Sequence, residues 1–444
     1  MALDTWPKEA HTLPLGVERD PQGNLTFSGV SLKELAQTYG TPLYVLSADV
    51  ARARAQAILQ AFHRVLGPRV YVSYAMKALY IPAFLSALKD LPLQFDAASY
   101  GEVVAAQKAG IPPSRLRLHG NNKTDRELEL AAQGAVGEVI IDNLDELERW
   151  LRLPRRGSLR FSLRVAPGIS PHTHEYIATG GRGGKFGVDL ESGEAFLALR
   201  EAEKGGLPIQ GLHAHLGSQI QEAEVYAEAL HRLLDLRAAF FEVTGRWLAE
   251  VNVGGGAAVR YDREKELSPA AWAESLAHAL SRRPRGEPRP VLGIEPGRAI
   301  AAPAGLTLYR VGDSHRVEGF APVVAVDGGM GDNIRPALYG AVYGAARVEG
   351  GGEGEEGPVH VVGRYCESGD ILLRGAVLPP LKRGDLLAVF LTGAYTHPMA
   401  MAYNGIPRPA AVLLEKGRHS LVWERETEQD LFRFHRLAPW QEGP

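Results

Sequence analysis

The chain has 444 residues, 45% of them hydrophobic, and its 49 basic and 52 acidic side chains give a net charge of −3. This composition excludes a disordered or fibrous chain, and the charge balance gives no basic footprint for nucleic acid. A single cysteine excludes an internal disulfide and a cysteine-rich zinc site, and we expect no metal. The N-terminus lacks the pattern of a signal peptide, and no apolar run reaches the ~18 residues of a membrane span, so we expect a cytoplasmic protein without membrane contacts.

From about residue 68, short β-rich runs alternate with stretches of helical periodicity, such as 100–110 and 145–153. The runs cover 70–78, 93–99, 116–121, 138–143, 160–167, 211–218, 249–256 and 291–297. Eight alternations of strand and helix predict a TIM-like (β/α)8 barrel. In such a barrel, the chemistry lies at the carboxyl ends of the strands.

After about residue 303, strand-like runs follow one another with few helix signals. They cover 307–317, 322–329, 359–366, 370–378, 386–395 and 420–426. This pattern predicts a separate C-terminal β-domain, a sandwich or barrel-like fold, and a strand-like run at 24–30 is expected to join it. The predicted organisation is an N-terminal segment 1–42, a barrel 43–302 and a β-domain 303–444.

Residues with chemical potential stand at the ends of the predicted barrel strands. Lys77 ends the first run, and a lysine at a barrel mouth is either a Schiff-base lysine or a snorkelling surface residue. His215 and Ser218 end the sixth run, and the glycines 254–256 end the seventh. The eighth ends in EPGR, residues 295–298. Taken singly, each has a structural reading: a hydrogen-bonded histidine, a tight turn, or a pair between the glutamate and the arginine.

Taken together, these residues match the needs of pyridoxal 5'-phosphate. The aldehyde needs a lysine, here Lys77, and the ring nitrogen needs an acid, here Glu295. His215 could stack on the ring. The phosphate needs backbone N–H groups, a hydroxyl and a cation, which are expected from Gly255, Gly256, Gly297, Ser218 and Arg298.

The chain resembles the fold-type III pyridoxal-phosphate decarboxylases from about residue 40 to about residue 415, and among them the branch that acts on meso-diaminopimelate. The resemblance rests on the order and spacing of YAMKA, DAASYGE, HGNNKT, RVAPGISPHTHEYIATGG, KFG, HAHLGSQI, VNVGGG, IEPGR, VDGGMGDNIRPALY, CESGD, GAY and YNGIPRP. It implies decarboxylation of meso-2,6-diaminopimelate to L-lysine and CO2, the last step of lysine biosynthesis by that route.

The resemblance also implies roles for single residues. Lys77 would carry the cofactor, which would be bound by Gly255, Glu295, Pro296, Gly297, Arg298 and Tyr395. The substrate would be contacted by Arg298, Arg335, Tyr339, Glu367 and Tyr395. Cys366 of CESGD would donate a proton, and in the family this motif enters the active site from the partner subunit. A homodimer with shared active sites is therefore expected.

Some positions depart from the family pattern. Leu79 stands where the family often has Asn, Gly184 replaces Ser before KFG, and the run 396–402 replaces a serine-rich one. These departures keep decarboxylation of ornithine, arginine or carboxynorspermidine as alternatives, whereas CESGD and the segment 172–181 favour diaminopimelate.

Functions of other classes are weaker alternatives. A racemase of this fold would have an arginine at the ring nitrogen, where this chain has Glu295. A non-catalytic carrier of the cofactor would lack the β-domain. An inactive paralogue serving as a scaffold is disfavoured because the charged site residues are all present.

Overall fold

The structure is a computed structural model that describes residues 13–154, 159–169, 184–261, 264–283, 286–350 and 355–441. The chain divides into two compact units. Residues Ala51–Ala302 form one, the barrel unit, and residues Met1–Val50 together with Pro303–Pro444 form the other, the β unit. The segment 172–181, which favoured diaminopimelate in the sequence, lies outside the described residues.

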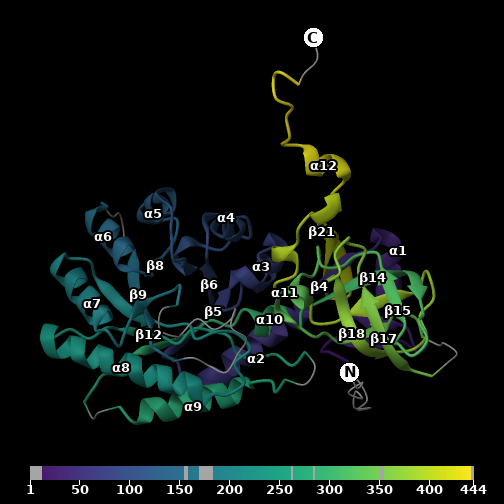
Figure 1. Cartoon of the computed structure of the whole chain (residues 1–444). Coiled ribbons are helices and arrows are strands. Elements are labelled where there is room, and N and C mark those ends of the chain that lie inside the picture. The colour runs from purple at the N-terminus through teal and green to yellow at the C-terminus, as the bar shows by residue number, and fades with distance from the viewer. Residues whose placement is uncertain are drawn as a thin grey trace. The chain divides into compact units, whose positions relative to one another are not determined.

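The barrel unit contains a closed parallel barrel of eight strands, which confirms the predicted fold (Figure 1). Its strands are β5 (Val70–Ala75), β6 (Leu93–Ala97), β7 (Leu116–Leu118), β8 (Glu138–Ile141), β9 (Arg160–Ala166), β11 (Ile209–His213), β12 (Glu250–Asn252) and β13 (Val291–Ile294). The pairing of β8 with β9 closes the barrel, and β10 (Val188–Asp189) pairs with the outer edge of β9. Each of the eight predicted runs contains or overlaps one of these strands.

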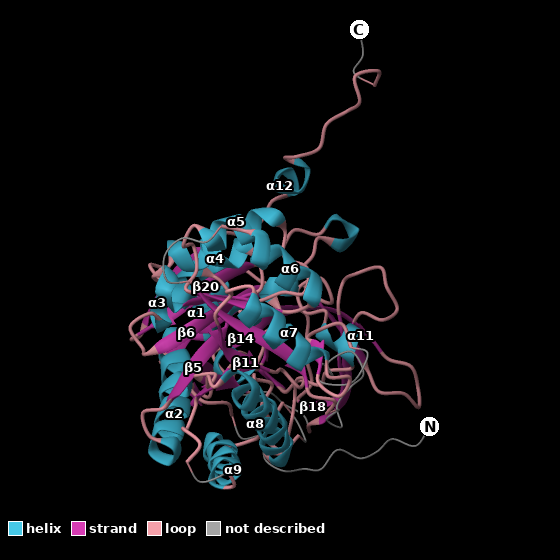
Figure 2. Cartoon of the chain, turned by 90° about the vertical axis from the view of Figure 1, so that its left-hand side faces the viewer, coloured by secondary structure: helices cyan, strands magenta, loops and turns pink. Residues whose placement is uncertain are grey.

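Helices lie around the barrel strands (Figure 2). They are α2 (Ala48–Leu66), α3 (Pro82–Leu88), α4 (Tyr100–Lys108), α5 (Asp125–Ala132), α6 (Leu144–Arg152), α7 (Glu194–Lys204), α8 (Glu224–Thr244), α9 (Pro269–Ser281) and α10 (Arg298–Ala301). Because helices cover the outer face, a strand such as β8 is buried at every residue, and its residues after Glu138 are apolar without alternation. The two predicted helices correspond to α4 and α6. None of the helices within the described ranges is both long and apolar enough to cross a membrane.

Side-chain caps fix the point at which the helices begin after the strands. Ser99, Thr124 and Asn143 accept hydrogen bonds from the third residue of α4, α5 and α6, respectively. At α5, the side chain of Glu127 accepts a hydrogen bond from the backbone N–H of Thr124 and so completes a capping box. The turns after the strands, where a barrel carries its chemistry, therefore have defined conformations.

Lys123 of the HGNNKT motif has a structural role. Its ammonium donates to the carbonyl oxygens of Gly120 at 2.8 Å and Ile140 at 2.7 Å, and to Glu146 at 2.9 Å. The side chain is buried, and a buried ammonium needs such a full set of acceptors. These bonds hold the turn after β7, which begins with His119.

The β unit contains a small sheet and a large one. The small sheet pairs β1 (Val17–Arg19), β2 (Leu25–Phe27) and β3 (Val30–Ser31), and α1 (Leu32–Tyr39) follows it. The large sheet has the order β18-β17-β15-β14-β4-β20-β21, with β19 paired to β14 and β16. Its strands are β4 (Leu43–Ser47), β14 (Gly305–His315), β15 (Val323–Val326), β16 (Ala345–Arg347), β17 (Gly357–Val362), β18 (Ile371–Leu378), β19 (Leu386–Val389), β20 (Ala410–Glu415) and β21 (Arg418–Trp423).

The six strand-like runs predicted after residue 303 are all found in this sheet, as β14, β15, β17, β18, β19 and β21. The structure differs from the predicted boundary at residue 43. Strand β4 pairs antiparallel with β14 and parallel with β20, so residues 43–47 belong to the large sheet. In the sequence, this buried strand resembles the start of the barrel because a long helix, α2, follows it directly.

Candidate active site

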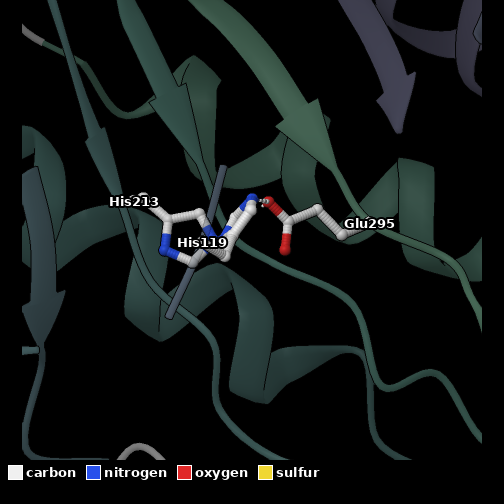
Figure 3. Close-up of side chains that lie close together, drawn as sticks. All are labelled: His119, His213 and Glu295. Atoms are coloured by element: carbon white, nitrogen blue, oxygen red, sulfur yellow. Dashed lines mark ion pairs between the residues drawn. The ribbon is translucent and has the colours of Figure 1, made fainter. Parts of the chain in front are cut away.

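The carboxylate of Glu295 lies at the carboxyl end of β13 and is surrounded by polar groups from other strands (Figure 3). Its Oε1 atom lies 2.9 Å from Nε2 of His213 and 3.7 Å from Nε2 of His119. Asn252 also donates from Nδ2 to Oε1 at 2.9 Å. The backbone of Glu295 is fixed as well, because its N–H donates to the carbonyl oxygen of Gly254 at 2.9 Å.

The two oxygens of this carboxylate differ in their contacts. Within the described ranges, the hydrogen bonds and ion pairs of the carboxylate all fall on Oε1. In Figure 3, the second oxygen points away from this contact. A carboxylate held by one oxygen can accept a further hydrogen bond through the other.

The charge state of Glu295 suits a protonated partner. Burial raises the pKa of its carboxyl and Asp96 adds to this, but the contacts with His213 and His119 outweigh both, so the pKa lies below its ordinary value. Glu295 is thus ionised at neutral pH. Burial lowers the pKa of His119 well below its usual range, although the charge of Glu295 opposes this. Nε2 of His119 also lies 3.3 Å from Asp96, which accepts a hydrogen bond from Ser73 at 2.5 Å.

His215 lies at the end of the sixth barrel strand, close to Lys77. Burial and the charge of Lys77 lower the pKa of His215 well below its usual range, so its ring is neutral and apolar on its faces. Lys77 lies in a short 3₁₀ turn (Met76–Ala78) directly after β5, with an exposed side chain. Nδ1 of His215 accepts a hydrogen bond from the N–H of Gly255 at 3.2 Å. This differs from the expectation that Gly255 offers its N–H to a phosphate, because the neighbouring imidazole already accepts it.

The remaining predicted phosphate ligands in the barrel unit lie together. Arg298 donates to the hydroxyl of Ser218 at 2.9 Å and to that of Tyr261 at 3.1 Å. The glycines have no room for a side chain: a Cβ at Gly256 would lie 2.0 Å from the carbonyl oxygen of Gly217. A Cβ at Gly297 would lie 3.0 Å from Ala75, two residues before Lys77. Pro296, between Glu295 and Gly297, is buried.

The other predicted residues lie in the β unit. Arg335 and Tyr339 are the first and last residues of α11 (Arg335–Tyr339), and buried Arg335 donates to the hydroxyl of Tyr343. Tyr395 has a φ of 59°, in the left-handed region that favours glycine. Such a conformation in a tyrosine costs free energy, so the surrounding structure must hold its backbone there.

Cys366 and Glu367 lie on an exposed turn. The N–H of Cys366 donates to the side chain of Asn404 at 2.8 Å. Asp370, at the end of the CESGD motif, accepts N–H groups from Tyr365 at 2.9 Å and from Met330 at 2.6 Å. These bonds connect CESGD to the VDGGMGDNIRPALY and YNGIPRP motifs, which are distant in the sequence.

Sequence reasoning missed three residues around Glu295. His119, His213 and Asn252 belong to the HGNNKT, HAHLGSQI and VNVGGG motifs, but no function was predicted for them. Each is a polar residue at or directly after the carboxyl end of a barrel strand, and that position was the available signal. This position did not show that all three residues contact Glu295, because that depends on the order of the strands in the barrel.

Comparison with known families identifies the barrel. The family model described as "Pyridoxal-dependent decarboxylase, pyridoxal binding domain" matches residues 52–302, the barrel unit almost from end to end. The site is therefore that of a pyridoxal-phosphate-dependent carboxy-lyase.

Comparison with individual proteins narrows the assignment. The diaminopimelate decarboxylase of Bacillus subtilis is 40% identical over 428 residues, which cover 94% of this chain and 97% of that protein. That of Actinosynnema pretiosum is 42% identical and covers 95% and 94%, respectively. The crystal structure of the M. jannaschii diaminopimelate decarboxylase in co-complex with L-lysine has a TM-score of 0.88 at 29% identity and covers 96% of this chain and 99% of that one. The chain belongs to the diaminopimelate decarboxylases of the fold-type III family.

The residues present fit this cofactor. An ionised carboxylate with one oxygen available suits a protonated ring nitrogen, and Gly255 and Gly256, where a Cβ would collide with backbone atoms, form a turn without side chains after β12. The ligand atoms of His119, His213 and Glu295 lie within 4.8 Å of one another, and zinc also accepts this donor set. Family membership decides in favour of the cofactor.

Gly255 provides a direct test of the crowded site. A Cβ there would lie 1.9 Å from the carbonyl oxygen of Glu295, so Gly255→Ala should displace the residue that is expected to face the ring nitrogen. We expect the variant to bind pyridoxal phosphate at least about tenfold more weakly, measured by titrating the apoprotein. Gly101→Ala is the matched control, because a Cβ on this residue of α4 meets only Ser99 at 3.6 Å. Equal affinity in both variants and the parent would contradict this view of the site.

Proposed function

We propose that this protein decarboxylates meso-2,6-diaminopimelate to L-lysine and CO2 with pyridoxal 5'-phosphate as its cofactor. One observation carries the proposal: an ionised Glu295, held by Oε1 at the end of the strand that pairs with β5, which leads into Lys77, in a chain that matches diaminopimelate decarboxylases over more than nine tenths of its length. When bound, the cofactor supplies an electron-poor ring that takes up the electron pair released as CO2 leaves.

Each barrel residue has a proposed task toward the cofactor. Lys77 would hold it covalently through its amine. Glu295 keeps the ring nitrogen protonated by pairing with it through Oε2. His215, fixed by Gly255, supports one face of the ring. The phosphate is bound by Ser218, Gly256, Gly297 and Arg298. Gly255 contributes to the cofactor site through His215, and Pro296 and Tyr395 complete the cofactor contacts.

The substrate has an amino group and a carboxylate at each end, and the proposed ligands match these charges. Guanidinium groups bind carboxylates with two parallel hydrogen bonds, which suits Arg298 and Arg335. Glu367 suits the distal ammonium. Tyr339 and Tyr395 contribute hydroxyl groups. Cys366 donates its thiol proton to the carbon atom that has lost CO2, and the thiolate is then reprotonated from solvent.

We further propose that the working unit is a homodimer with shared active sites, in which Cys366 and Glu367 serve the partner. Their turn is exposed in the single chain yet held by defined hydrogen bonds, which suits residues that complete a site elsewhere. We also propose a cytoplasmic location, since a free, exposed cysteine suits a reducing compartment.

The substrate assignment is tested by a panel of amino acids. Purified protein with pyridoxal phosphate is incubated separately with meso-diaminopimelate, ornithine, arginine and carboxynorspermidine, and CO2 release is measured. We expect meso-diaminopimelate to be preferred by at least about 10³-fold in kcat/KM, because the other substrates leave buried charged groups unpaired. Release from another member of the panel but not from meso-diaminopimelate would overturn the assignment.

The shared site is tested by mixing two inactive variants. Lys77→Ala removes the cofactor lysine, and Cys366→Ala should slow proton delivery while cofactor binding survives. If each site takes Lys77 from one subunit and Cys366 from the other, subunit exchange in an equal mixture should restore about a quarter of the parent activity, because half the dimers contain one intact site.

A mixture of Lys77→Ala and Glu295→Gln is the control, because both changes lie in the barrel unit and no intact site can form. Failure of the first mixture to gain activity, with subunit exchange verified by mass, would mean that each chain builds its own site. Unchanged turnover of Cys366→Ala alone would remove this thiol from the reaction.

A further inference from the structure

Asn252, the last residue of β12, connects Glu295 to two other parts of the barrel unit through one buried amide. Its Nδ2 atom donates to Oε1 of Glu295 at 2.9 Å and to the hydroxyl of Tyr71 at 2.9 Å. Its Oδ1 atom accepts the N–H of Gly254 at 2.8 Å. The same side chain therefore contacts the carboxylate that faces the ring nitrogen and the start of the glycine turn.

The hydroxyl of Tyr71 belongs to a buried ionic network inside the barrel. It donates to Glu250 and accepts from Arg117, whose guanidinium lies 4.4 Å from the centre of the Tyr71 ring. Arg117 is 1% exposed and donates to Glu138 at 2.7 and 3.0 Å. This network lies on β5, β7, β8 and β12. Removing one member would leave a buried charge without its partner, so the network is held in one arrangement.

The network fixes which way the Asn252 amide faces. Burial raises the pKa of Tyr71 well above its ordinary value, so the hydroxyl keeps its single proton and donates it to Glu250. Toward Asn252 the hydroxyl can then only accept, which requires the NH2 group on that side. The N–H of Gly254 requires the amide oxygen on the other side. These two contacts together turn the NH2 group of Asn252, and not its oxygen, toward Glu295.

We propose that Asn252 is a positioning residue for the reaction: its amide holds Oε1 of Glu295 so that Oε2 faces the ring nitrogen of the cofactor. This inference rests on one part of the proposed function, namely that pyridoxal phosphate binds at Glu295. The charged and titratable groups that face Glu295 from the surrounding elements are Asp96, His119, Arg164 and His213. Asn252 adds a neutral donor to that set.

Asn252→Asp separates positioning from a purely structural role. The substitution keeps the side-chain volume and the acceptor for Gly254, but it replaces the NH2 group with a carboxylate oxygen beside Glu295. The added negative charge raises the pKa of Glu295. On acidification, the carboxylate is therefore protonated at a higher pH than in the parent protein. We expect the acid limb of kcat/KM to move up by about one pH unit and kcat to fall at least about tenfold, with KM changed less than about threefold.

A binding measurement without substrate makes the test independent of the reaction. Titration of the Asn252→Asp apoprotein with pyridoxal phosphate should give a Kd about tenfold above that of the parent. Asn143→Asp is the matched control, because Asn143 also accepts a backbone N–H, from Glu146, and donates to a backbone carbonyl oxygen, that of Asn121. Parent values for Kd, kcat and pH profile in Asn252→Asp would overturn the inference.

Tyr71→Phe decides the question if Asn252→Asp does not fold. It leaves Asn252 unchanged but removes the hydroxyl that orients the amide, and we expect Kd and kcat to worsen about threefold or more. Parent values in this variant would also overturn the inference. If the parent protein binds pyridoxal phosphate but releases no CO2 from meso-diaminopimelate, only the proposed substrate is contradicted. The Kd measurements on Asn252→Asp would still test the inference.

Discussion

The chemistry of this protein depends on an ionised carboxylate that is buried at the carboxyl end of a barrel strand. Burying Glu295 without partners would favour its neutral form, and a neutral acid could not keep a ring nitrogen protonated. The contacts with His213 and His119 prevent this, and together with Asn252 they fall on one oxygen of the carboxylate, which leaves the other for the proposed contact with the cofactor. The charge is therefore maintained by the chain itself, before any ligand arrives.

The parallel barrel is what brings these partners together. Strands β11, β12, β13 and β5 are neighbours, so His213, Asn252, Glu295 and the turn with Lys77 occupy adjacent strand ends. Below them, the buried ions around Arg117 lie across the interior and connect through Tyr71 to Asn252. Hydrogen-bonded polar groups thus connect the amino ends of β8 and β12 to the carboxyl end of the barrel.

Much of this architecture could be predicted from the sequence, because strand and helix periods alternate cleanly through the barrel. Lys77 and Glu295 could also be proposed from the sequence, since each lies within two residues after a strand and has a residue type that the cofactor requires. Asn252 and His213 were not, because their role depends on contacts across strands that lie 43 and 82 residues from Glu295 in the sequence. Strand β4 was placed in the barrel because the sequence shows which helix follows a strand, but not which strands pair with it.

The central claim is that Lys77 holds pyridoxal phosphate opposite Glu295. It is tested most directly by reducing the purified, cofactor-loaded protein with borohydride, digesting it and locating the cofactor by mass spectrometry. The account predicts loss of the yellow colour and a stable modification on the peptide that contains Lys77. Modification of another lysine, such as the buried Lys123, or no modification at all, would contradict it.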